Sequence, residues 1–183
     1  MITLLRFADV TLRRGGLLLF ERLNLRVQAG EALQIAGPNG SGKSSLIRLA
    51  AGLLTAQAGS IERSPLALAD DNIALDRELP LGRALRFWCR GPDQALAHMG
   101  LLALEDVSVR WLSSGQLKRA TIARVASSGA PLWLLDEPLN ALDADGATLL
   151  SRLIASHLAS GGAVLAASHQ PLPGEWRRLD LTA

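Results

Sequence analysis

A glycine-rich stretch that ends in a lysine and two serines offers the chemistry of phosphate binding. Residues 37–44 fit the pattern G-x-x-x-x-G-K-[S/T], with an apolar run before them and Ser45 and a helical pattern after them. Glycines leave room for backbone N–H groups to turn toward phosphate oxygens, and a helix N-terminus adds partial positive charge. The stretch therefore predicts a nucleoside-triphosphate site made of Gly37, Pro38, Asn39, Gly40, Ser41, Gly42, Lys43, Ser44 and Ser45.

Within this stretch Lys43 is expected to reach the β- and γ-phosphates, and the Ser44 hydroxyl to bind Mg²⁺. Two acids, Asp136 and Glu137, follow the apolar run 132–135. A carboxylate at the end of a buried strand is costly unless it is paired or holds a metal. Asp136 is therefore predicted to hold Mg²⁺ through water opposite Ser44, and Glu137 to act as general base on the attacking water. The alternative for an isolated Asp-Glu pair is a helix cap or a surface turn.

A third strand end carries His169, which follows the apolar run 162–168. Ligands of parallel sheets bind at the carboxyl ends of the strands, so Gly37, Asp136 and His169 are expected to converge. The alternative for His169 is a histidine at a strand end without a ligand. His98 and His157 have no such context and are predicted to be solvated helix residues.

The serines of residues 112–116 open a helical pattern that continues through 117–125. Serines and a glycine at a helix start can donate hydrogen bonds to an anion. An ordinary N-cap explains the same residues, and this stretch alone favours the cap.

The remaining pattern predicts the elements that must position these groups. Strands are expected within 2–28 with a turn at Gly15-Gly16, at 32–36, from 61, at 131–136 and at 162–169, and helices after 43, from 81 to 88, 95–104, 117–125 and 147–158. Continuous apolar strands that alternate with helices indicate an α/β fold with a parallel sheet covered on both faces. We expect one domain over 1–183, with a helical subdomain at about 72–127 inserted into the α/β core.

Composition narrows the class of protein. The 183 residues are 49% apolar and 20% charged, which is a globular profile. A scattered net charge of +2 and 4% aromatic residues give no case for a nucleic-acid partner. The single cysteine, Cys89, excludes an internal disulfide and is expected to be a small buried residue. No run approaches the roughly 18 to 20 apolar residues of a membrane span, and no secretory signal is visible, so we expect a cytoplasmic chain that reaches a membrane through a partner.

Taken in order, 37–44, 112–116, 134–138, 141–143 and His169 resemble the motifs of ABC-type ATPases: Walker A loop, signature, Walker B strand with its glutamate, D-loop and switch histidine. The resemblance implies a P-loop NTPase of the ABC type, with N-terminal antiparallel strands in a mixed-sheet core. It also implies ATP and Mg²⁺ as ligands and a head-to-tail homodimer with two ATP molecules at the interface.

In such a dimer the signature of one subunit closes the site of the other. The resemblance assigns this role to Leu112, Ser113, Ser114, Gly115 and Gln116, with Ser114 and Gly115 on the γ-phosphate. It further implies that Asp143 contacts the partner subunit and that His169 binds the γ-phosphate and helps to place the attacking water.

A narrower resemblance covers 85–88, 136–146 and 168–172, which are similar to the ATPase subunits of bacterial haem exporters in cytochrome c maturation. It implies integral membrane transporter subunits as partners and a peripheral position on the cytoplasmic face of the inner membrane. ATPase subunits of lipid, drug or lipoprotein exporters, and soluble ABC-type ATPases, are the alternatives.

Two positions depart from the ABC pattern. No glutamine lies between Gln57 and Gln94, where the family usually has one that meets Mg²⁺ and the membrane partner. Asn72 stands near the matching place and is a candidate metal ligand. The usual aromatic residue on adenine is also missing; Arg13 or Arg14 could stack there as a planar guanidinium, and a solvated charge is the alternative.

Overall fold

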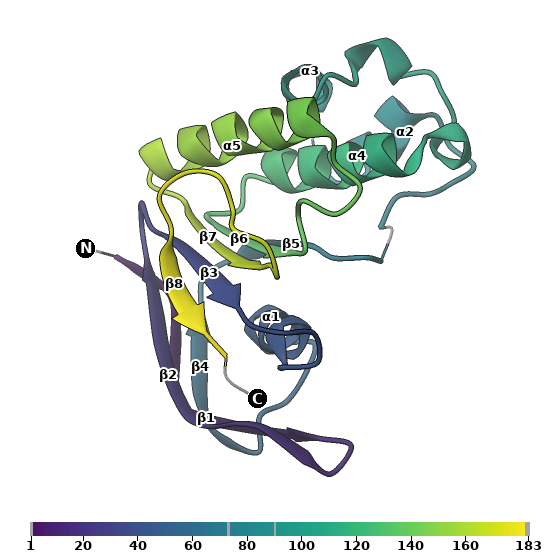
Figure 1. The fold of residues 1–183 in the computed structure, drawn as a ribbon. Helices are drawn as coiled ribbons and strands as arrows, with labels where there is room; N and C mark the ends of the chain where they lie inside the picture. The colour runs from purple at the N-terminus through teal and green to yellow at the C-terminus, as the bar shows by residue number, and fades with distance from the viewer. Residues whose placement is uncertain (1, 73, 90, 182–183) are drawn as a thin grey trace.

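Five parallel strands form the central sheet of the computed structural model over the residues it describes, which are 2–72, 74–89 and 91–181. The strand order is β5-β6-β7-β3-β8 (Figure 1). Their bounds are β3 (Ala32–Ala36), β5 (Leu66–Ala69), β6 (Leu132–Asp136), β7 (Ala163–Ala167) and β8 (Arg177–Asp180). Every residue of β3, β6 and β7 is buried, as continuous apolar runs predict for strands covered on both faces.

The N-terminal part of the chain adds a separate antiparallel sheet. Its order is β2-β1-β4, with β1 at Thr3–Arg14, β2 at Leu17–Gln28 and β4 at Ala58–Arg63. Gly15 and Gly16 form the predicted turn, with φ values of +57° and +82° that glycine adopts without strain. The predicted combination of antiparallel N-terminal strands with a parallel core is confirmed, and the two kinds of strand form two sheets.

Alternate residues of the parallel strands point into two apolar clusters. Leu132 and Leu134 of β6 pack with residues of α1 (Lys43–Ala51), β1 and β2. Trp133 and Leu135, which point the other way, pack with residues of α4 (Ser114–Ser127) and α5 (Ala144–Ala159). The parallel sheet is therefore the middle layer, and its strand ends are held rigidly from both faces.

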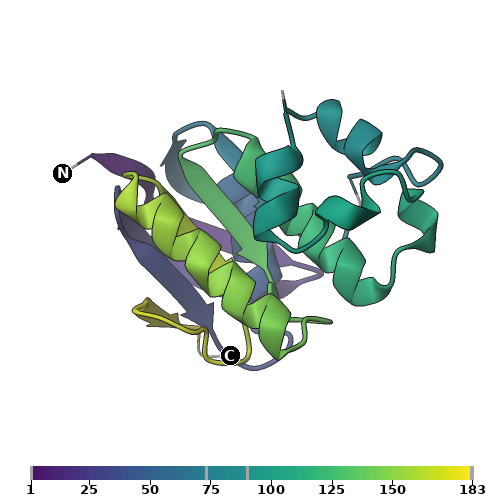
Figure 2. The same ribbon diagram turned by 90° about the horizontal axis from the view of Figure 1, so that it is seen from above.

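The helical part between β5 and β6 lies at one end of the molecule (Figure 2). It consists of α2 (Leu81–Arg86), α3 (Asp93–His98), two 3₁₀ turns, η1 (Leu102–Leu104) and η2 (Val109–Trp111), and α4. The helix predicted at 95–104 ends at His98, because Gly100 takes a left-handed φ of +64°. Helix α4 begins at Ser114, three residues earlier than predicted, because Ser113 caps it.

Two side chains differ from their predictions. His157 is not a solvated helix residue: its ring stacks on Trp133 with centroids 3.7 Å apart, and burial lowers the pKa of His157. Cys89 is half-buried rather than buried. Among the residues with described positions, no helix combines the length and the apolar character that crossing a membrane requires.

Candidate functional site

The loop between β3 and α1 depends on its glycines. Gly37 has φ +148°, and a Cβ there would lie 2.6 Å from the carbonyl oxygen of Leu181 and 2.8 Å from the Ser41 hydroxyl. Gly42 precedes the first turn of α1 with φ +96°. These backbone conformations are rarely open to other residues, so the loop can turn its amides inward only with glycine at both positions.

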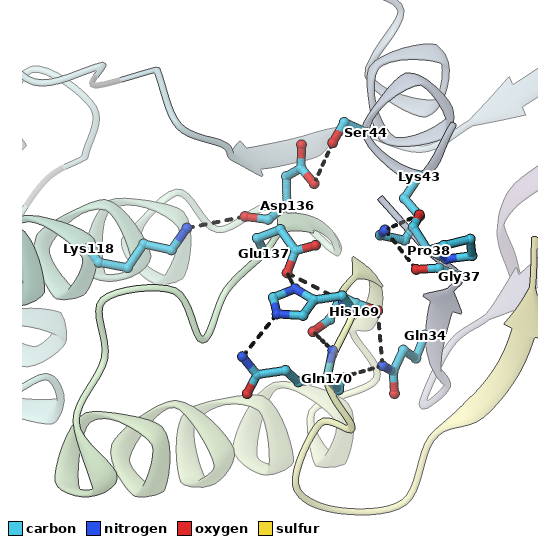
Figure 3. A network of polar contacts seen from close by, with 11 residues as sticks. Gln34, Gly37, Pro38, Lys43, Ser44, Lys118, Asp136, Glu137, His169 and Gln170 are labelled. Carbon is cyan, nitrogen blue, oxygen red and sulfur yellow. Dashed lines mark hydrogen bonds and ion pairs between the residues drawn. The ribbon is translucent and has the colours of Figure 1, made fainter. Parts of the chain in front are cut away.

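Lys43 closes the loop. Its side chain is only 5% exposed, and Nζ donates hydrogen bonds to the carbonyl oxygens of Gly37 at 2.9 Å and Pro38 at 3.0 Å (Figure 3). The ammonium group is thus held across the mouth of the loop. The Ser41 hydroxyl is also buried, without a hydrogen-bond partner in the described part of the chain. A buried cation and a free hydroxyl in a nest of amides fit a phosphate ligand.

Ser44, in the first turn of α1, meets Asp136 at the end of β6. The Ser44 hydroxyl donates to Oδ1 of Asp136 at 3.1 Å, and Asp136 is only 5% exposed. Burial raises the pKa of Asp136; the hydrogen bond from Ser44 opposes this shift, and the charge of Asp71 adds to it. A hydroxyl and a carboxylate in contact are the hard oxygen ligands that Mg²⁺ takes in nucleotide sites, so these residues fit the metal.

Glu137 and His169 form a pair beside this contact. The Glu137 backbone has an uncommon φ of +44°, and its N–H donates to the carbonyl oxygen of Ala167 at 2.8 Å. Its Oε2 lies 2.8 Å from Nδ1 of His169 (Figure 3). Glu137 is 17% exposed and His169 is 42% exposed. A left-handed backbone at a bulky acid is costly, and such conformations cluster at functional sites.

A hollow of about 460 Å³ is lined by residues of the phosphate loop and by the Glu137–His169 pair. Its lining comprises Arg14, Leu19, Asn39, Gly40, Gly42, Lys43, Ser44, Ser45, Glu137, Asn140 and His169. The structure thus brings the phosphate loop, Glu137 and His169 to one cavity. Of the two hairpin arginines, Arg14 lines the hollow, and its Nη1 lies 3.4 Å from the Ser45 hydroxyl. Leu19 and Asn140 were not predicted.

The residues of 112–116 lie at the N-terminus of α4 and are not among those that line this hollow. Ser113 and Gln116 form the capping box, so the N-cap alternative holds for Ser113. Ser114 is exposed, and a Cβ on Gly115 would lie 2.8 Å from the carbonyl oxygen of Ala141. Asp143, which is exposed, caps α5 by accepting a hydrogen bond from the Gly146 N–H at 2.7 Å.

Asn72 does not join Ser44 and Asp136. Its amide donates to Asp70 at 2.8 Å, and it lines a different hollow, of about 410 Å³, with Trp88 and Arg124. The neighbouring Asp71 is the residue of this segment whose charge acts on Asp136. The sequence pattern could not resolve which side chain of this exposed segment acts on Asp136.

Lys118 is a functional candidate that motif reasoning missed. It lies on α4, and its Nζ donates to the backbone carbonyl oxygen of Asp136 at 3.2 Å (Figure 3). Burial lowers the pKa of Lys118, while the negative charges of Asp71, Asp136 and Glu137 raise it. Its position two residues after the 112–116 motif, on the same predicted helix, is the feature of the sequence that could have indicated it.

Comparison with known proteins agrees with this site. The family model described as "ABC transporter" matches residues 20–140. A cytochrome c biogenesis ATP-binding export protein CcmA of Novosphingobium aromaticivorans is 56% identical over 167 residues, covering 90% of this chain and 87% of the relative. A protein of the same name from Sphingopyxis alaskensis is 51% identical, over 92% and 91% of the two chains.

Solved structures give the same fold at lower identity. The ATP-binding subunit of an ABC transporter superimposes with a TM-score of 0.83 at 23% identity, over 91% of this chain and 80% of that one. A nucleotide-free ATP-binding cassette from an ABC transporter gives 0.77 at 19% identity, over 92% and 82%. The motifs, the cavity and these relatives agree: the chain belongs to the ABC transporter family, in the group of the cytochrome c biogenesis ATP-binding export proteins.

Proposed function

We propose that this chain binds and hydrolyses ATP as the ATPase subunit of a membrane complex that serves haem export or cytochrome c maturation. The observation that carries the ATPase role is the Glu137–His169 pair, at 2.8 Å, on the wall of the phosphate cavity. The relatives named for cytochrome c biogenesis support the narrower role.

The residues of the cavity divide the chemical work. Backbone amides of 37–45 hold the phosphates, and Lys43 exchanges its two carbonyl partners for phosphate oxygens. Ser44 and Asp136 would hold Mg²⁺, which would supply positive charge to neutralise the phosphates. Glu137 takes a proton from the attacking water, while His169, on the wall of the same cavity, holds the carboxylate in place.

The nucleotide base needs a different partner from the family's usual aromatic residue. Arg14 and Leu19 lie on the wall of the cavity, while Arg13 is not part of its lining. A planar guanidinium can stack on a base, and an apolar side chain can pack against it. We assign adenine contact to Arg14 and Leu19.

Each site is completed in trans within a homodimer. The exposed Ser114 and the adjacent Gly115 lie outside the cavity of their own chain, which supports their use by a second copy. Gly115 and Ala141 are in close approach, so the signature and the loop with Asp143 would meet the partner together. Besides this contact, Asp143 keeps its capping role on α5.

A second surface suits the membrane subunits. The hollow that Asn72 lines also contains Trp88, and the neighbouring Phe87 is 82% exposed. Leu53, on the same hollow, is 61% exposed. Exposed apolar groups on a rim of this kind mark an interaction site. We assign this surface, with Asn72 as a contact and not a metal ligand, to integral membrane partners on the cytoplasmic face of the inner membrane.

The substitution Glu137→Gln tests the ATPase role. It keeps the shape and removes the base, so ATP binding should persist while turnover falls by about 100-fold or more. The variant should also accumulate as an ATP-bound dimer, measured by light scattering with and without ATP·Mg²⁺. Hydrolysis at the wild-type rate would refute the assignment of the base.

Co-purification tests the narrower role. The tagged chain, isolated from its own bacterial membranes, should retain integral subunits, and Phe87→Ser should release them without loss of basal ATPase activity. Leu17→Ser, at the similarly exposed tip of the hairpin, is the matched control. Cells that lack the chain should lose haem-containing cytochromes c; normal cytochrome levels would contradict the haem role.

A further inference from the structure

A buried amide side chain interrupts the apolar strand β3. Leu33 and Ile35 point into the cluster that contains α1, so Gln34 points to the opposite face of the parallel sheet. It is only 5% exposed. An amide at such a depth is costly unless its hydrogen bonds are made. The partners of Gln34 therefore indicate why it is there.

All of these partners are backbone groups of the segment that follows β7. The Gln34 Nε2 donates to the carbonyl oxygen of Gln170 at 2.7 Å and lies 3.5 Å from that of Ser168. Its Oε1 lies 3.4 Å from the N–H of Leu172. Leu172 is itself buried, so its backbone N–H needs a partner within the protein. Gln34 fixes the path of 168–172.

This path sets the position of Gln170 next to His169. The Gln170 Nε2 lies 3.1 Å from Nε2 of the His169 ring, and the opposite ring nitrogen, Nδ1, lies 2.8 Å from Glu137 Oε2 (Figure 3). An amide nitrogen donates and cannot accept. The ring nitrogen that faces it must then accept, which leaves the proton of the neutral ring on Nδ1, where it is donated to Glu137.

We propose that Gln170, held through its backbone by Gln34, is a positioning residue that keeps His169 in the tautomer with its proton on Nδ1 and its ring against Glu137. The proposal deepens the proposed function, because it matters for turnover only if Glu137 and His169 act on ATP. It extends the site by two glutamines, one within β3 and one in the segment after β7, and neither belongs to a phosphate-binding motif.

Nitrogen-15 NMR of the histidine rings tests the tautomer directly, on the full chain without nucleotide. The chain has three histidines, so His169→Ala assigns the signal. The wild type should show the His169 proton on Nδ1. Gln170→Ala should let the Nε2 tautomer appear, and Gln170→Glu, whose carboxylate accepts, should move the proton to Nε2. Gln57→Ala, at an exposed glutamine outside the cavity lining, should leave the signal unchanged.

Kinetics supplies the second readout. Gln170→Ala should lower kcat for ATP about three- to tenfold, the effect of one hydrogen bond on a reacting group, and leave KM unchanged. Gln34→Met should likewise lower kcat and leave KM unchanged. Because Gln170 is exposed, its variants should fold and carry the test even if Gln34→Met does not fold. A wild-type ring with its proton on Nε2, or an unchanged tautomer in Gln170→Ala, would overturn the proposal. These spectra do not depend on hydrolysis, so failure of the Glu137→Gln test would be a separate result.

Discussion

At the scale of one residue, the buried carboxylate of Asp136 lowers the stability of the folded chain. Burial raises the pKa of its carboxyl group, and Asp71 and Glu137 add negative charge nearby. At pH values above this raised pKa, the folded chain buries a carboxylate that water would hydrate better in the unfolded chain. The charged group therefore costs folding free energy at neutral pH, and the cost fades as pH falls through the raised pKa. Mg²⁺ between Ser44 and Asp136 would remove it.

The substitution Asp136→Asn should separate stability from activity. Without Mg²⁺ at pH 7 the variant should melt at a higher temperature than the wild type, because the buried charge is gone while Oδ1 can still accept from Ser44. The difference in Tm should shrink as pH is lowered, and Mg²⁺-dependent turnover should fall by about 100-fold or more. Thermal unfolding over a pH series and a steady-state assay measure both; a less stable variant at pH 7 would contradict this account.

The sequence could predict the site residues that belong to a known motif or directly follow a buried strand. Lys43, Glu137 and His169 line one cavity because parallel strands end at the same edge of the sheet. Gln34 could not be found in this way, since a buried amide in an apolar strand has no pattern until its partners are known, and Gln170 is an exposed residue whose contact with His169 depends on the path of the chain after β7. His157 was misread because its stacking on Trp133 depends on tertiary packing.

At the scale of one element, α4 contains two candidate functional side chains on the same face. Ser114 and Lys118 are four residues apart, which places them one turn apart on a helix. Ser114 is exposed at the N-terminus, while Lys118 reaches the Asp136 carbonyl oxygen in its own chain. If Ser114 meets the ATP of a partner, α4 connects the two ATP sites of the dimer through one rigid helix.

The substitution Lys118→Met should weaken that connection. Methionine fills the space without a charge or a donor, so the Asp136 end of β6 should lose its tie to α4. We expect a fall in kcat of about tenfold, and a Hill coefficient for ATP that moves toward one, in a steady-state assay. Lys118→Arg, which keeps the charge and a donor, should retain more of both; a Hill coefficient that is unchanged in Lys118→Met would rule out the connection.

Prediction of elements succeeded where hydrophobic runs were long. Strands β3, β6 and β7 were expected close to their observed bounds because all of their residues are buried and all but Gln34 and Asp136 are apolar. Strands β5 and β8 were not expected. Each has four residues, and β8 has the polar sequence Arg-Arg-Leu-Asp, which an edge strand can carry because one side of it faces solvent.

At the scale of the whole molecule, the two groups of residues that we propose for the ATP site lie apart in one chain. The phosphate loop, Asp136 and Glu137 are at the strand ends, whereas Ser114 and Gly115 begin α4 outside the cavity lining. If each site is built from residues of two subunits, two variants that are inactive for different reasons can restore activity in a mixed dimer. A site built within one subunit would not allow this.

Mixing two inactive variants tests this. Lys43→Ala removes the phosphate contact and Ser114→Ala removes the signature hydroxyl, so each homodimer should lose most of its activity. A mixed dimer contains one site with both parts intact, and a 1:1 mixture should therefore recover about a quarter of the wild-type activity if half of the dimers are mixed and one site in two works. Activity in the mixture no higher than that of either variant alone would exclude assembly in trans.

The placement of Ser114 outside the cavity of its own chain also sets the order of the reaction. If Ser114 completes the site of a partner, a subunit alone is inactive, and at low concentration the rate should rise with the square of the subunit concentration. Isolated subunits at low concentration would then hydrolyse little cellular ATP. A membrane complex that holds two copies side by side would replace this chance encounter with a fixed high local concentration, and hydrolysis would become confined to assembled transporters.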